Sequence, residues 1–105
     1  MFIIFDTEYT SWEGTNEKGY NRVTQFPEIV QISAIKVDDN FKIIDKFNVY
    51  VKPIINPKLS KYFINLTKIS QNKINKDGIS LVKALNLFYI FCKNNGKCID
   101  IYSYG

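Results

Sequence analysis

Two carboxylates, two residues apart, are the side chains of this 105-residue chain best suited to do chemistry. Asp6 and Glu8 directly follow an apolar run, Phe2 to Phe5. Alternate side chains of a strand point to the same face, so Asp6 and Glu8 are expected to share a face while Thr7 points away. Neighbouring carboxylates repel each other unless a cation lies between them, and Mg2+ or Mn2+ prefers oxygen ligands. The pair predicts a metal site, although acidic pairs also occur where a strand simply meets solvent.

A sheet is needed to hold the acidic pair, and the sequence predicts one. The apolar run before Asp6 suits a strand buried on both faces. Residues 28–37 and 42–51 have the composition and partial alternation of strands, with a turn at Asp38-Asp39-Asn40 between them. They predict an antiparallel hairpin that pairs with the first strand. A strand over 98–102 follows a helix and is therefore expected to run parallel to the first.

Helices are predicted between the hairpin and the last strand. Residues 52–57 leave the sheet, because proline removes ladder donors. Residues 59–65 and 67–73 predict two short helices, the second capped by Thr67. A longer helix follows residues 77–80 and is stopped by Asn95-Gly96. Its apolar residues recur at three- and four-residue spacing, which predicts one buried face. That face consists of Leu81, Val82, Leu85, Phe88 and Cys92.

Composition predicts a single small globular domain over residues 1–105. The chain is 46% apolar and 15% aromatic, which excludes a disordered chain. Its 14 basic and 10 acidic residues give a net charge of +4, which permits a polyanionic partner without requiring one. No stretch approaches the roughly 20 apolar residues that cross a bilayer, and no basic leader opens the chain. We therefore expect no membrane partner and a cytoplasmic location.

The polar segment 11–26 and the two cysteines are the remaining features of note. A loop this long in so small a domain is usually functional or mobile. Its aromatic residues Trp12 and Tyr20 either stack on bases or pin the loop to the domain, and pinning is favoured. Cys92 and Cys98 match neither a redox nor a zinc spacing, and the chain has no histidine. Both cysteines are interpreted as small buried hydrophobes.

Three stretches occur in an order that is typical of one protein family. They are FDTEYT at 5–10, PEIVQISA at 27–34, and YVKP at 50–53 with LTKISQ at 66–71. In this order they resemble the N-terminal portion of a DnaQ-like (DEDD) 3'-to-5' exonuclease, and DTEYTSWEG with LTKIS points to the Eri-type exonucleases. The resemblance spans the whole chain. It implies an α/β, ribonuclease H-like exonuclease fold, in which an antiparallel three-stranded unit is followed by helices and a parallel strand.

The resemblance also implies what the acidic pair does. Asp6 and Glu8 would be catalytic, metal-binding acids, the first two of a four-acid site. In such a site two Mg2+ or Mn2+ ions roughly 4 Å apart clamp the scissile phosphate, generate the attacking hydroxide and stabilise the leaving oxygen. The implied partner is single-stranded or 3'-ended nucleic acid, RNA or DNA. The implied substrate-binding residues are Thr7, Tyr9, Thr10 and Leu66. Thr10 also fits a strand-end hydroxyl, and Leu66 also fits a core position.

The later acids of the family have no counterpart in this sequence. The family's second motif places an aspartate just after a strand that ends like residues 102–105, and a still later aspartate accompanies a histidine or tyrosine base. Asp100 lies upstream of that position and is interpreted as structural. We therefore expect a truncated or split domain that is inactive alone. The alternatives are a non-catalytic nucleic-acid-binding remnant, a remnant whose open sheet pairs with a second polypeptide, and an unrelated α/β binding domain.

Overall fold

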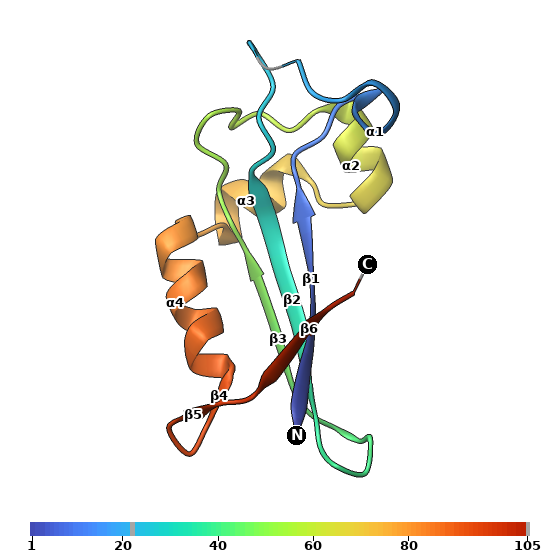
Figure 1. Ribbon diagram of the computed structural model, residues 1–105. Coiled ribbons are helices and arrows are strands. Elements are labelled where there is room, and N and C mark those ends of the chain that lie inside the picture. Colours follow the sequence, from blue (N-terminus) through green and yellow to red (C-terminus); the bar gives the residue numbers. More distant parts are fainter. Residues whose placement is uncertain (22, 105) are drawn as a thin grey trace.

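A mixed four-stranded sheet forms the body of the molecule (Figure 1). The computed structural model describes residues 1–21 and 23–104. The sheet order is β3-β2-β1-β6, so that β1 is antiparallel to β2 and parallel to β6. The strands are β1 (Phe2–Tyr9), β2 (Ile29–Val37), β3 (Ile43–Tyr50) and β6 (Asp100–Ser103). The predicted hairpin, its pairing with the first strand and the parallel last strand are confirmed.

The turn between β2 and β3 forms where its residue types predict it. One carboxylate oxygen of Asp38 accepts the backbone N–H groups of Asn40 and Lys42, each at 2.9 Å. Phe41 adopts a left-handed backbone with φ of 62°. Asp is suited to such a turn because its short side chain can bond the backbone two residues on. The turn therefore fixes the register in which β3 pairs with β2.

Four helices and a small hairpin complete the described chain. The helices are α1 (Thr15–Lys18), α2 (Lys61–Thr67), α3 (Gln71–Asp77) and α4 (Leu81–Phe91), and the hairpin is β4 (Lys93–Asn94) with β5 (Lys97–Cys98). Figure 1 shows α1, α2 and α3 gathered at the end of the sheet where β1 finishes, and α4 alongside the sheet. Within residues 1–21 and 23–104, no helix has the length and apolar character needed to cross a bilayer.

The second short helix begins later than predicted. A helix over 67–73 capped by Thr67 is wrong, because Thr67 ends α2 and its hydroxyl donates to the Phe63 carbonyl at 2.9 Å. Lys68 then takes a left-handed φ of 64°, which terminates α2. The hydroxyl of Ser70 accepts the Lys73 N–H at 3.1 Å and caps α3. Ser60 and Ser80 cap α2 and α4 in the same way, so these serines are the sequence signal for the three helix starts.

The buried face of α4 differs from the predicted one. Ala84, Phe91 and Cys92 are buried and Phe88 is half-buried. Leu81, Val82 and Leu85, which were predicted to be buried, are 39%, 71% and 46% exposed. The reason is the small side chain of Ala84, which lets the helix approach Ile32 and Val51 closely and so turns the 84-88-91 stripe toward the sheet.

The first strand is covered on one face and not on both. Ile3 is fully buried in a cluster with Ala34, Phe91 and Cys92, on the face that α4 covers. The flanking residue Ile4 is only half-buried, so the prediction of burial on both faces is wrong. It fails because, within residues 1–21 and 23–104, the helix that packs on the middle of the sheet is α4 and it lies on one side.

The segment between α4 and β6 contains two further corrections. Asn95 and Gly96 do not stop the helix, which ends at Phe91. They form the turn of the β4–β5 hairpin, with φ of 52° and 79°. Asn-Gly is favoured there because both positions of such a turn need positive φ. Cys92 is buried as predicted, but Cys98 is exposed because it lies on this hairpin, outside the main sheet.

Gly78 follows α3 and packs so closely against Ile74 and Lys52 that no side chain fits there. Its replacement tests this close packing. A Cβ at this position would clash with the Ile74 carbonyl oxygen and lie 2.7 Å from Cγ of Lys52. We expect Gly78→Ala to lower the free energy of unfolding by about 1 to 3 kcal/mol, as overpacking typically does. Urea denaturation measures this change, with the exposed Asn72→Ala on α3 as a control that should stay within about 0.5 kcal/mol of the parent. An unchanged stability in Gly78→Ala would contradict the packing.

Candidate active site

A cavity of about 340 Å³ opens where β1 ends, and both acids lie in it. Its walls come from five parts of the chain: β1, the loop after β1, α1, the end of α2 and the end of β6. Ser103 and Tyr104 line it because β6 runs parallel to β1, and Tyr104 donates its N–H to the Phe5 carbonyl at 2.8 Å. The cavity therefore lies at the carboxyl ends of two parallel strands, an edge where ligands bind in open α/β sheets.

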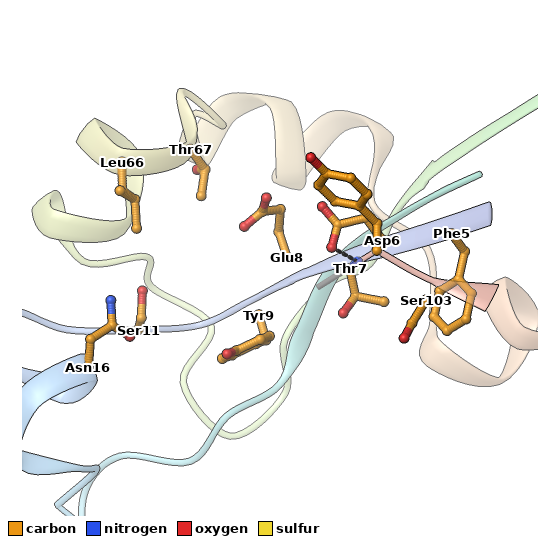
Figure 2. Close-up of a pocket in the computed structure, with 11 residues that line it drawn as sticks. Phe5, Asp6, Thr7, Glu8, Tyr9, Ser11, Asn16, Leu66, Thr67 and Ser103 are labelled. Atoms are coloured by element: carbon orange, nitrogen blue, oxygen red, sulfur yellow. Dashed lines mark hydrogen bonds between the residues drawn. The ribbon is translucent and has the colours of Figure 1, made fainter. Parts of the chain in front are cut away.

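The two carboxylates share a face of β1, as the alternation predicts. Figure 2 shows the side chains of Asp6 and Glu8 on one side of the strand and Thr7 on the other. Pairing with β2 sets this orientation, because Asp6, Thr7 and Glu8 lie opposite three consecutive β2 residues without a break. The Thr7 N–H donates to one oxygen of Asp6 at 2.9 Å. Both carboxylate side chains line the cavity.

The surroundings of Glu8 shift its pKa. Partial burial and, as the smaller cause, the charge of Asp6 raise the pKa of the Glu8 carboxyl above its ordinary value of 4.5. A cation between the two carboxylates would remove the repulsion that contributes to this shift. Both groups offer hard oxygen ligands, so Asp6 and Glu8 suit a divalent metal. Among the described residues there is no group of three or more His, Cys, Asp or Glu side chains that could hold one.

The raised pKa of Glu8 predicts a measurable pH dependence. The folded chain holds the Glu8 proton more tightly than the unfolded chain does. This contribution to stability is therefore fully present below pH 4.5 and is lost as the pH rises through the raised pKa. We expect Asp6→Asn to bring the pKa of Glu8 only part of the way back, because burial is the larger cause. A carbon-13 NMR titration of the Glu8 carboxyl in the parent and in Asp6→Asn measures both values, and identical values would exclude any contribution from Asp6.

Helix α2 forms the wall opposite the strand. Leu66 is 59% exposed and lines the cavity, so it does not occupy the core position that the sequence also allowed. The adjoining Phe63 is 1% exposed and anchors the helix. The Ser60 hydroxyl donates to the Ser11 carbonyl at 2.6 Å and ties the start of α2 to the loop after β1. Leu66 is thereby held as an apolar surface across from the acids.

The loop after β1 is pinned to the domain by its aromatic residues. The rings of Trp12 and Tyr20 pack edge to face with centroids 5.9 Å apart. The Tyr20 hydroxyl donates to the Thr10 carbonyl at 2.7 Å. Thr15 is buried, and its hydroxyl donates to the Trp12 carbonyl at 2.8 Å. The Tyr20 hydroxyl therefore ties the loop to the residue that follows β1, as the pinning role predicts, while the Trp12 ring packs on Tyr20 within the loop.

Thr10 is buried and is not among the residues that line the cavity. It is 3% exposed, its hydroxyl donates to the Phe26 carbonyl at 2.8 Å, and the same hydroxyl accepts the Glu28 N–H at 2.9 Å. This geometry fits the strand-end hydroxyl that the sequence allowed as an alternative. Thr7, Tyr9 and Leu66, the other residues expected beside the nucleotide, all line the cavity.

Several residues around the site were not identified from the sequence. Glu28 clamps the segment after β3, because its carboxylate accepts the N–H groups of Ile54, Ile55 and Asn56 at 2.6, 3.1 and 2.8 Å. A glutamate directly after a proline carries no signal for such a role. The cavity-lining residues that the sequence did not indicate are Ser11, Asn16, Thr67, Ser103 and Tyr104. Asp100 lies opposite Phe2, at the other end of β6 from the cavity.

Comparison with known proteins identifies the family. A model of the family described as Exonuclease matches residues 3–100. The 3'-5' exonuclease eri1 of Schizosaccharomyces pombe is 31% identical over 97 residues, which are 92% of this chain and 31% of that protein. The probable 3'-5' exonuclease KapD of Bacillus subtilis is 31% identical over 74 residues, which are 70% of this chain and 34% of that protein. The chain thus spans about a third of the length of these relatives.

The solved structures that resemble this chain are also exonucleases. The nuclease domain of 3'hExo, described as a DEDDh family member bound to rAMP, superposes with a TM-score of 0.81 at 26% identity over 99% of this chain and 51% of that chain. A 3'-exonuclease described in 3'-end specific recognition of a histone mRNA stem-loop gives a TM-score of 0.83 at 25% identity over 99% of this chain and 35% of that chain. The α/β fold is ribonuclease H-like, as predicted. The chain belongs to the Exonuclease family, and the solved structures that it resembles include a DEDDh nuclease domain.

Proposed function

We propose that this chain carries the first acidic motif of a metal-dependent 3'-to-5' exonuclease domain that hydrolyses phosphodiester bonds at the 3' ends of RNA or DNA. The observation that carries the proposal is the placement of Asp6 and Glu8 on one face of β1, inside a cavity whose opposite wall is the exposed Leu66. Family membership supports the reaction type. The cytoplasmic location expected from the sequence is part of the same proposal.

Asp6 and Glu8 are the residues that would hold Mg2+ or Mn2+. Two such ions, when bound, supply Lewis-acid stabilisation of the negative charge that develops on a phosphate during hydrolysis. Asp6 and Glu8 provide the negative charge and the oxygen ligands. Leu66 provides an apolar surface for a terminal base, and Thr7 and Tyr9, which line the same cavity, are proposed to lie beside the terminal nucleotide.

The isolated chain is proposed to be inactive. Asp6 and Glu8 account for two of the four acids that the resemblance implies, and the described residues hold no larger group of metal-binding side chains. With fewer protein ligands, the positive charge of the ions is less fully compensated and their coordination geometry is less well defined. The remaining acids would come from residues outside this sequence, in the same polypeptide or in a second one that completes the sheet at β6.

Binding of a 3' end tests the proposal without requiring turnover. A linear oligoribonucleotide and a covalently circular one of the same sequence differ only in having ends. In Mn2+ we expect the chain to bind the linear form several-fold more tightly, and we expect the preference to disappear in EDTA and in Asp6→Ala. Fluorescence anisotropy measures both affinities. Equal, metal-independent binding of both forms would instead support a non-catalytic nucleic-acid-binding domain.

A nuclease assay tests the expected inactivity separately. A 5'-labelled single-stranded RNA and the corresponding DNA are incubated with the chain in Mg2+ or Mn2+ and resolved on a denaturing gel. We expect no degradation above the level given by Asp6→Ala. Degradation that is abolished in Asp6→Ala would contradict the inactivity of these 105 residues while supporting the exonuclease function.

A further inference from the structure

Asn16, on α1, is one of the residues that line the cavity. Along the cavity, Asp6 and Glu8 are followed by Tyr9, and Figure 2 shows Asn16 beyond Tyr9, on the same side of the view as Leu66. Among the described residues that line this cavity, Asn16 is the only one with a side-chain amide. A nucleotide whose phosphate lies at the carboxylates would extend its base toward Leu66 and Asn16.

Contacts with α2 and within the loop hold Asn16 in this place. Its side-chain N–H donates to the Tyr62 hydroxyl at 3.3 Å. Tyr62 lies one turn before Leu66 on α2, so the same helix that presents Leu66 also orients the amide. The helix that carries Asn16, α1, begins after Gly14 and ends before Gly19, whose φ angles of 88° and 79° suit glycine.

The hydrogen-bonding capacity of the amide indicates what it binds. An asparagine side chain has two N–H donors and one oxygen acceptor. Tyr62 takes one N–H, which leaves Asn16 one donor and an acceptor side by side. The edges of the nucleobases offer an acceptor beside a donor, and unstacked bases are recognised through these edges. Leu66 could contact the face of the same base while Asn16 contacts its edge.

We propose that Asn16 is a specificity-determining residue that hydrogen-bonds the base edge of the nucleotide held in the cavity, with Tyr62 as its positioning residue. This inference rests on the proposed function, because it requires a nucleotide whose phosphate lies at Asp6 and Glu8. The ligand class is a nucleoside 5'-monophosphate unit.

Two ligands that differ only by the base test the proposal. Proton–nitrogen NMR titrations in Mg2+ give the dissociation constants of AMP and of ribose 5-phosphate for the 105-residue chain. We expect Asn16→Ala to weaken AMP binding by about 3- to 10-fold, as the loss of a hydrogen bond does, and to leave ribose 5-phosphate binding unchanged. Tyr62→Phe should weaken AMP in the same selective manner by a smaller factor. The ratio of the two constants is insensitive to a general loss of fold.

Asn65→Ala is a matched control variant for Asn16→Ala. Asn65→Ala removes an exposed amide from α2, the helix that carries Tyr62 and Leu66. Asn65 does not line this cavity, so neither dissociation constant should change. AMP affinity that is equal in Asn16→Ala and the parent would overturn the role of Asn16 and leave the proposed function standing. A parent chain that binds neither ligand, with or without Mg2+, would overturn the proposed function and this inference together.

Discussion

Asp6→Ala is expected to weaken Mn2+ binding to the chain by at least about 100-fold. Removing a group that merely orients a metal ligand already costs roughly 10- to 100-fold in affinity, and Asp6 is proposed as a ligand itself. The Asp6 side chain is exposed, so its removal leaves the packing of the sheet intact. Titration of Mn2+ followed by electron paramagnetic resonance measures the fraction of free ion and hence the affinity.

Asp45→Ala is a matched control for this experiment. Asp45 is an exposed aspartate on β3, and its carboxylate accepts the N–H of the next residue, Lys46, at 2.8 Å. Asp6 makes the same local contact with Thr7 at 2.9 Å. The two variants therefore lose the same charge and the same local hydrogen bond, and Asp45→Ala should bind Mn2+ like the parent. Equal weakening in both variants would show a nonspecific charge effect, and no weakening in Asp6→Ala would remove the proposed metal site.

The placement of the acidic pair could be predicted because it depends on local geometry. Alternation along a strand puts Asp6 and Glu8 on one face whatever the rest of the chain does, and pairing with β2 preserves that alternation. The parallel last strand followed from the helix that precedes it. These two inferences together locate the end of β6 beside Asp6, which is where the structure has it.

Features that depend on packing could not be predicted with the same success. Thr67 and Ser70 are both suitable caps, and the choice between them follows from the left-handed turn at Lys68 and from the burial of Ile69 in the core. Helix α4 is apolar around much of its circumference, so its periodicity alone did not show that Ala84 marks the buried stripe. In each case the deciding contacts are between segments distant in the sequence.

Asn16 illustrates the same limit within the site. It lies in a polar loop without periodicity, and its hydrogen-bond partner Tyr62 is 46 positions away. The loop reaches the cavity because Tyr20 and Thr15 pin it, and those contacts involve backbone carbonyls of Thr10 and Trp12 that carry no sequence signal. Side chains at the ends of strands are therefore easier to assign to a site than side chains that loops bring to it.

Phe63→Ala is expected to lower the free energy of unfolding by about 3 to 5 kcal/mol, which is a large part of the 5 to 15 kcal/mol typical of a domain. Phe63 is 1% exposed and is the largest fully buried side chain among residues 1–21 and 23–104. It fills the cluster that joins α2 and α3 to the end of the sheet. The other buried members are Val30, Leu59, Ile69 and Ile74. Truncation leaves a cavity in addition to the lost transfer free energy, since neighbours collapse only in part.

Urea denaturation measures this change. The milder variant Phe63→Leu distinguishes effects on α2, which carries Leu66, from effects on Asp6 and Glu8. Phe63→Leu should retain the fold at a smaller cost, with α2 less firmly held. Because Asp6 and Glu8 are positioned by β2 and not by α2, Mn2+ affinity should stay at the parental value in Phe63→Leu. AMP binding, for which Leu66 and Asn16 are proposed contacts, should become weaker. Lys61→Ala, at an exposed position of α2, should change neither stability nor AMP binding. A parallel loss of Mn2+ and AMP binding in Phe63→Leu would mean that the acids depend on α2 and that strand pairing alone does not position them.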